Sequence, residues 1–98
     1  MTGMTFEEFE SQARAKGFDE VLTRQWAPGT VLDSHTHPFA VEARVVDGEM
    51  WLAVGENDRH LRAGDTFELD RDVVHSERYG AQGATYWVAR RNSGAART

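Results

Sequence analysis

Three of the four histidines have a spacing that suits a metal ion. His35 and His37 are separated by one residue, and side chains two positions apart on a β-strand point to the same face. Their roots would lie roughly 6–7 Å apart, so one cation can contact both rings. A third imidazole must come from another strand, and His75 is the candidate because it follows a predicted strand at 66–69 and a tight polar turn. The chain has no cysteine, which excludes thiolate ligands and cysteine nucleophiles.

Acidic and phenolic side chains share strand faces with these histidines. If His75 points inward, Glu77 and Tyr79 point inward too, and we predict these two as the catalytic residues. Asp33 has the same parity as His35. Because a buried carboxylate is costly unless it is paired or metal-bound, Glu77 and Asp33 are candidates for a general base, a partner of a histidine N–H group or a replacement metal ligand. The alternative is that either acid lies in water at the mouth of the fold.

The remaining histidine and the tryptophans have simpler explanations. His60 lies in a polar stretch between turns and is expected to face solvent. Aromatic residues are enriched in cores and in subunit interfaces, and we expect these roles for Trp26, Trp51 and Trp87. One or two of them can instead line a substrate pocket, together with Phe39, Phe67 and Tyr86.

The elements that must position these groups begin with a short helix in residues 1–17. Thr5 precedes Glu8 by three residues, which is the spacing of a capping box. Gly17 is suited to end the helix. The apolar side chains that would staple it and pack it on one edge of the fold are Met4, Phe6, Phe9 and Ala13.

Residues 18–91 have the pattern of an all-β fold. Turn-forming residues recur at short intervals between runs rich in Val, Leu, Thr, Trp and Tyr, which is typical of a sandwich or barrel. Asp47-Gly48 is the strongest hairpin signal, because a type I′ turn needs two residues with positive φ. We expect the last strand at about 84–91, and we expect residues 92–98, which are small and polar, to form a disordered tail.

Size and charge limit the classes of partner. A chain of 98 residues and 11.0 kDa is one small domain. Its net charge of −5 argues against nucleic acid and against anionic membranes as partners. The longest apolar run, residues 50–54, is too short to span a bilayer, and the first residues lack the pattern of a signal peptide. We therefore expect a cytoplasmic protein with a small-molecule substrate or ligand.

Two stretches resemble the motifs of the cupin family. Residues 28–39 contain a glycine, five further residues and then His-x-His, and a glycine follows at Gly48. Residues 64–75 contain Gly-Asp, a strand, a turn and then His75. Both glycine-to-histidine spacings are similar to those of the family, and the resemblance covers about residues 20–90.

The resemblance implies a small antiparallel jelly-roll β-barrel, here with a short N-terminal helix. It also implies that His35, His37 and His75 point inward near one mouth of the barrel and bind a metal ion. Single-barrel cupins commonly form dimers, so we expect a homodimer. The sequence departs from the family pattern at Asp70 and Asp72, which stand where the second motif usually has Pro and Gly.

The identity of a fourth ligand is open. In the family it is commonly a glutamate four or five positions after the second histidine, which here points to Glu42, whereas counting back from Gly48 places it at Val41. Alternation favours an outward Glu42 paired with a neighbouring cation, because the opposite face of this strand is wholly apolar: Val41, Ala43 and Val45. A β-bulge in this strand would reverse the two faces.

A three-histidine site suits a divalent transition metal, with Fe, Mn, Ni, Cu and Zn all possible. Three neutral ligands leave the full charge on the ion and leave coordination positions free, which favours an anionic ligand such as a carboxylate, an enolate or a diketonate. Imidazoles bind metal only when deprotonated, and their ordinary pKa is about 6.5. We therefore expect metal affinity to fall steeply below about pH 6.

Two main classes of function remain. The first is a small metal-dependent enzyme of oxygenase, isomerase or lyase type, which acts on a small oxygen-bearing substrate while Glu77 or Asp33 moves a proton. The second is a non-catalytic module that binds or senses a ligand or metal. A third alternative is a barrel that no longer binds metal. The expected fold hosts all of these, so it does not choose among them.

Overall fold

A computed structural model describes residues 3–92, which form one helix and six antiparallel strands. The helix is α1 (Phe6–Ala15). The strands are β1 (Glu20–Trp26), β2 (Val31–His35), β3 (Ala40–Val54), β4 (Asn57–Arg62), β5 (Thr66–Leu69) and β6 (His75–Arg91). The predicted all-β class with an N-terminal helix is confirmed. The predicted disordered tail lies, from residue 93 onward, outside the described residues.

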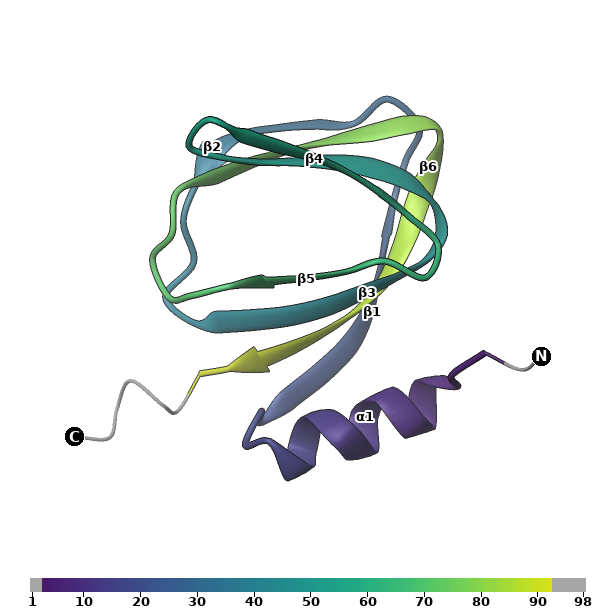
Figure 1. The fold of residues 1–98 in the computed structure, drawn as a ribbon, viewed down its shortest axis with the longest axis vertical. Coiled ribbons are helices and arrows are strands. Elements are labelled where there is room, and N and C mark those ends of the chain that lie inside the picture. The colour runs from purple at the N-terminus through teal and green to yellow at the C-terminus, as the bar shows by residue number, and fades with distance from the viewer. Residues whose placement is uncertain (1–2, 93–98) are drawn as a thin grey trace.

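The two longest strands, β3 and β6, hold the fold together because each belongs to both layers of a curled sheet (Figure 1). They pair with each other from end to end. One layer consists of β1, the second half of β6, the first half of β3, and β5. The other consists of β2, the first half of β6, the second half of β3, and β4. The layers face each other as in a jelly roll, although hydrogen bonds among the described strands do not close the barrel.

β3 and β6 bend from one layer to the other at a pair of glycines. The register of β3 against β6 shifts on both sides of Asp47-Gly48, which marks β-bulges. Gly48 and Gly83 have φ angles of 76° and 74°. A Cβ atom on Gly48 would lie 2.1 Å from the carbonyl oxygen of Gly83, so only glycine fits there. The prediction of a hairpin at Asp47-Gly48 is therefore wrong: the positive φ bends a continuous strand instead of reversing it.

The same bend explains a second error. The strand predicted at about 84–91 is only the second half of β6, because the glycines between 80 and 83 lie within the strand and do not end it. The hairpin that joins β3 to β4 is formed by Gly55-Glu56, where Gly55 has a φ of 60°. A glycine with positive φ at the first central position is what a type II′ hairpin requires.

The interior between the layers is filled mainly by apolar side chains. Its largest fully buried members are Met50, Val45 and Leu61. The alternation predicted for β3 is confirmed, since Val41, Ala43 and Val45 are all buried in the core.

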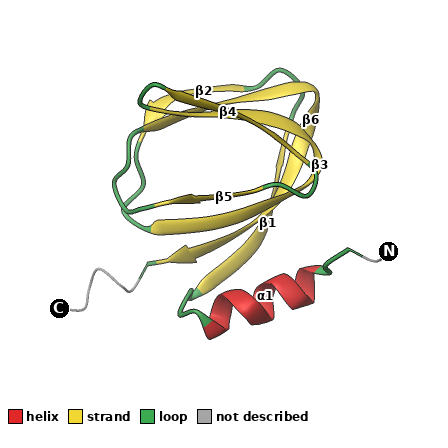
Figure 2. Ribbon diagram, in the orientation of Figure 1, coloured by secondary structure: helices red, strands yellow, loops and turns green. Residues whose placement is uncertain are grey.

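Helix α1 covers the outer face of the layer that contains β1 (Figure 2). It begins with the predicted capping box between Thr5 and Glu8, and the chain leaves it through Gly17, whose φ is 94°. The helix packs on β1 and β6 through a small cluster made of Met4, Phe9, Ala13, Phe18, Val21, Trp87 and Ala89. Within the described residues, no helix is both long and apolar enough to cross a membrane.

Candidate metal centre

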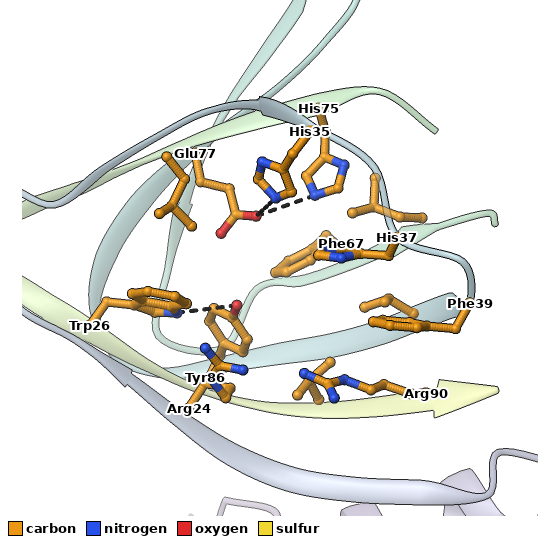
Figure 3. Close-up of a pocket in the computed structure, with 14 residues that line it drawn as sticks. Arg24, Trp26, His35, His37, Phe39, Phe67, His75, Glu77, Tyr86 and Arg90 are labelled. Atoms are coloured by element: carbon orange, nitrogen blue, oxygen red, sulfur yellow. Dashed lines mark hydrogen bonds and ion pairs between the residues drawn. The ribbon is translucent and has the colours of Figure 1, made fainter. Parts of the chain in front are cut away.

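Three histidines and one glutamate converge inside the barrel (Figure 3). His35 ends β2, His37 lies in the loop that follows, and His75 and Glu77 come from the start of β6. One potential ligand atom of each side chain lies within 4.8 Å of those of the other three. The ring centroids of His35 and His75 are 4.3 Å apart, and that of His37 is 5.0 Å from each. The structure thus brings together the three predicted ligands and adds a carboxylate.

The backbone fixes which nitrogen of two of these rings carries the proton. Nδ1 of His35 lies 2.6 Å from the carbonyl oxygen of Asp33, and Nδ1 of His75 lies 2.9 Å from that of Val73. A carbonyl oxygen only accepts hydrogen bonds, so in the neutral ring Nδ1 donates the proton. Nε2 is then left with a free lone pair, which is the usual arrangement of histidine ligands to metals.

The Nε2 atom of His75 is the group that most needs a ligand. The His75 side chain is 1% exposed, and its Nε2 atom is buried without a hydrogen-bond partner. Oε2 of Glu77 lies 3.3 Å from this atom, outside hydrogen-bond geometry, and 3.6 Å from Nε2 of His35. Leaving a buried polar atom unpaired typically costs about 1–3 kcal/mol. A cation bound among these atoms would satisfy all three, so the residues present fit a metal ion.

Glu77 is held in place by a buried tyrosine. Tyr79 donates a hydrogen bond to Oε1 of Glu77, which leaves Oε2 directed at the histidines. Burial, together with Tyr86 and Glu77, raises the pKa of Tyr79, so its hydroxyl remains a donor. The hydroxyl group of a second tyrosine, Tyr86, accepts a hydrogen bond of 3.2 Å from Nε1 of Trp26. Glu77 and Tyr79 are thus both buried, as alternation along the strand predicts, but Tyr79 lies behind Glu77 and does not line the pocket.

The surroundings of His37 favour the neutral form of its ring. Burial lowers its pKa, and the neighbouring rings of His75 and His35 lower it further. Its imidazole is stacked on Phe39, with centroids 4.9 Å apart and planes inclined by 10°. The lowered pKa favours the neutral ring, which is the form that binds a metal ion.

A pocket of about 100 Å³ adjoins the cluster. The three histidines and Glu77 line one side, and Arg24 and Arg90 line the side across from them (Figure 3). Val41, the alternative position for a fourth ligand, is part of the aliphatic wall. The aromatic part of the wall consists of Trp26, Phe39, Phe67 and Tyr86, which is the alternative that the sequence left open for these residues.

Asp33 does not join the cluster through its carboxylate. The pairing of β2 with β6 shifts between Leu32 and His35, so Leu32 and His35 both line the pocket while the Asp33 side chain is exposed. The parity that places Asp33 on the inward face is therefore wrong, because an irregularity in the strand breaks the alternation. The alternative, a solvent-exposed Asp33, is the one that the structure shows. Asp33 still contributes to the site through its carbonyl group, which accepts the hydrogen bond from His35.

Two other candidates lie on the outside of the barrel. The Glu42 carboxylate is 2.8 Å from Nζ of Lys16, which is the outward, cation-paired position that alternation favours. His60 is exposed, as predicted. It stacks on Trp51 with ring centroids 4.6 Å apart and lies 2.7 Å from a carboxylate oxygen of Glu49.

The sequence reasoning missed the two arginines of the pocket. Arg24 lies two residues before Trp26 on β1, and Arg90 lies two residues after Val88 on β6. Each therefore shares an inward face with a residue of the pocket wall. The alternation along β1 and β6 carries the signal, because each arginine is a charged residue that shares a strand face with apolar neighbours.

Comparison with known proteins agrees with this geometry. The sequence matches the family model of the cupin domain over residues 23–88. No curated protein matches it by sequence. An RmlC-like cupin from Shewanella frigidimarina superposes with a TM-score of 0.63 and 23% identity, over 71% of this chain and 63% of that one.

Two further structures show the range of proteins with this fold. Oxalate oxidase in complex with the substrate analogue glycolate has a TM-score of 0.63 and 26% identity, over 72% of this chain and 40% of that one. CENP-C of Drosophila melanogaster, bound to CAL1, has a TM-score of 0.62 and 22% identity, over 71% and 60%. The present chain thus spans less than two thirds of the length of each structure.

Proposed function

Because this chain belongs to the cupin family, we propose that it is a metal-dependent enzyme whose divalent transition-metal ion is held by His35, His37, His75 and Glu77. The substrate is a small oxygen-bearing molecule, and the reaction is of oxygenase, isomerase or lyase type. The observation that carries the proposal is the buried, unpartnered Nε2 atom of His75, which lies beside Glu77 on the wall of a pocket.

The donor set limits what the site binds. Three neutral imidazoles and one carboxylate only partly neutralise a divalent ion, so the remaining ligand is an anionic oxygen. A bound metal would supply Lewis-acid polarisation of that oxygen or activation of O₂. Aromatic and aliphatic side chains form much of the pocket wall, and an apolar environment strengthens electrostatic interactions.

Glu77 is the carboxylate of the cluster, so it is the candidate general base of the chain as well as its fourth metal ligand. Its Oε2 atom faces the histidines, while its Oε1 atom accepts the hydrogen bond from Tyr79. Tyr79 is a positioning residue, since it acts through Glu77 and does not line the pocket. Glu77→Gln separates two roles of the carboxylate: loss of metal identifies a ligand, whereas loss of turnover with metal retained identifies a general base.

Elemental analysis of protein purified without chelator tests the metal centre. We expect about one transition-metal ion per chain in the parent and almost none in His75→Ala. His60→Ala is the matched control, because His60 also lies beside a glutamate but on the outer face, and it should retain the metal. Equal metal content in His75→Ala and the parent would refute the centre.

Turnover is tested on the metal-loaded protein. Oxygen uptake with a 1,3-diketone or a thiol reports on oxygenase chemistry. Exchange of carbon-bound hydrogen with D₂O next to a carbonyl group, followed by NMR, reports on isomerase or lyase chemistry. Rates above those of His75→Ala support an enzyme.

A non-catalytic binding module is the second candidate function. CENP-C, whose structure has this fold, is bound to the protein CAL1, so the fold is also found in a protein that takes part in binding. Stoichiometric metal combined with tight ligand binding, and with no oxygen uptake and no hydrogen exchange, would support this alternative over the enzyme.

A further inference from the structure

We propose that Arg24 and Arg90 form an anion-binding wall opposite the metal centre, so that the ligand of the pocket is a small organic acid with two anionic groups. One group would bind the metal, and the other would bind the guanidinium groups. Binding of one group to the metal rests on the proposed function. Binding of the other group to the guanidinium groups rests on the arginines alone.

The two arginines belong to neighbouring strands of one layer. In the antiparallel register of β1 and β6, the backbone of Arg24 lies opposite that of Tyr86, and the backbone of Arg90 lies opposite that of Glu20. Both arginines line the pocket, and both lie across it from the histidines (Figure 3). A ligand that contacts the metal centre and the opposite wall at once must therefore present polar groups at two ends.

Arg24 carries a charge that no acid of the described chain neutralises. Its guanidinium carbon lies 4.8 Å from the centre of the Trp26 ring, and residues 3–92 provide it with no carboxylate partner. The ring supports the guanidinium group from one face and leaves its N–H donors free. A planar, bidentate acceptor such as a carboxylate is the natural partner for such a group.

Arg90 is partly paired but has an unused donor. Its side chain is 22% exposed, and Nη1 lies 3.6 Å from a carboxylate oxygen of Glu20. Its Nε atom is buried without a hydrogen-bond partner, and its guanidinium carbon lies 4.8 Å from the centre of the Phe39 ring. A buried N–H donor of a charged group is costly to leave unpaired, so this atom too indicates a missing acceptor.

The charge balance of the pocket favours a dianion. With a divalent cation bound, Glu77 and Glu20 would balance only half of the positive charge on the metal and the two guanidinium groups, and a dianion neutralises the rest. The volume of about 100 Å³ is well below the roughly 300–1,000 Å³ typical of drug-sized ligands, which restricts the occupant to a short acid.

Isothermal titration of protein loaded with Zn²⁺, which is redox-inert, tests the wall. The probes are succinate and butyrate, which have the same carbon count but differ by one carboxylate. We expect succinate to bind about 10- to 100-fold more tightly, which corresponds to the usual strength of hydrogen bonds to charged groups. Equal affinities for the two acids would overturn the inference.

Substitution assigns the effect to the arginines. Arg24→Gln and Arg90→Gln should each reduce the preference for succinate, and the double variant should abolish it, with the metal content unchanged. Arg62→Gln is the control, because this exposed arginine of β4 lies outside the pocket. A double variant that binds succinate as tightly as the parent would contradict the proposal. If loss of the Glu20 contact unfolds Arg90→Gln, comparison of Arg24→Gln with Arg24→Lys decides alone, and Arg24→Lys should retain part of the preference.

Failure of the metal centre and failure of the anion wall are distinguishable. If the parent takes up no metal, the proposed function fails, and the wall is judged by titrating succinate into metal-free parent and Arg24→Gln. Weaker binding to Arg24→Gln then supports the wall, and equal binding refutes it. If the parent takes up metal but does not prefer succinate, the wall fails while the metal centre stands.

Discussion

The interior of this barrel contains two buried side chains, Met50 and His75, whose surroundings are chemically opposite. Around Met50, which is fully buried, the neighbours are apolar side chains such as Val45 and Leu61. Around His75, which is 2% exposed, the neighbours are imidazoles and a carboxylate, and one buried nitrogen has no hydrogen-bond partner. The difference indicates two separate roles. The Met50 region stabilises the fold, whereas the buried polar atoms of the His75 region are satisfied only when a ligand binds. Substitutions in the two regions should therefore have separable effects on stability and on binding.

The largest expected effect is on stability, from truncation in the apolar region. Met50→Ala removes a fully buried side chain and should lower the free energy of unfolding by about 2–5 kcal/mol, measured by urea denaturation. Metal content measured in the cold, where the variant is still folded, should match that of the parent. A loss below about 1 kcal/mol would show that the core relaxes around the cavity and would weaken the contrast between the regions.

The second effect is the dependence of stability on metal. At a free metal concentration 100 times the Kd, binding should stabilise the native state by about 2.7 kcal/mol, and a chelator should remove this gain. Thermal melts with and without Zn²⁺ measure it. In His75→Ala the two melts should coincide, while His60→Ala should behave like the parent. A metal-dependent shift that persists in His75→Ala would place the ion elsewhere.

The third effect connects the two regions through Tyr79, which contacts Glu77 but belongs to the apolar core. Tyr79→Phe deprives a buried carboxylate of its donor and should cost about 1–3 kcal/mol in metal-free protein. The cost should be smaller in metal-loaded protein, since the cation then stabilises the carboxylate. Tyr86→Phe is the comparison, because it removes the acceptor of Trp26 but leaves the hydrogen bond from Tyr79 to Glu77 in place. Equal costs of Tyr79→Phe with and without metal would argue that Glu77 does not face the ion.

The smallest effect is a pH dependence of the metal-free protein. The pKa of His37 is lowered in the folded state, so the unfolded chain binds its proton first as pH falls. The stability that this group contributes is present above pH ~6.5 and is lost as pH falls from there through the folded pKa, with a slope of at most about 1.4 kcal/mol per pH unit. The charged and titratable groups that face His37 are His35, His75, Glu77 and Arg90.

Urea denaturation of metal-free protein at pH 7.5 and pH 5.5 measures this dependence. His37→Gln should show a flatter profile than the parent, because the substituted side chain does not titrate. A parent that is more stable at pH 5.5 than at pH 7.5, or a His37→Gln profile as steep as that of the parent, would contradict the assignment.

Local patterns predicted the parts of the molecule that local physics controls. The capping box at Thr5 and the alternation of Val41, Ala43 and Val45 depend on neighbours a few residues away, and both are confirmed. The convergence of His75 with His35 required a family resemblance, because it depends on two strands far apart in the chain. Glu77 was identified from its parity with His75, since β6 is regular between the two residues.

The errors have one physical origin. Counting parity works only along an uninterrupted strand, and β-bulges arise from contacts between strands that the sequence of one strand does not reveal. The shift between Leu32 and His35 removed Asp33 from the site, and the shifts around Gly48 turned an expected hairpin into a bend. The turn signals at Gly48 and at the glycines between 80 and 83 were real. Tertiary structure decided whether these glycines reversed the chain or only bent it.

The contact between Gly48 and Gly83 has a consequence for anyone who redesigns this protein. A Cβ atom on Gly83 would lie 2.3 Å from the carbonyl oxygen of Trp26, so three segments of backbone meet there with no room for a side chain. Mutational libraries that aim at new ligands should hold positions 48 and 83 constant and vary wall residues such as Phe67 and Val88. The crossing would then keep the two long strands in register while the specificity of the pocket is altered.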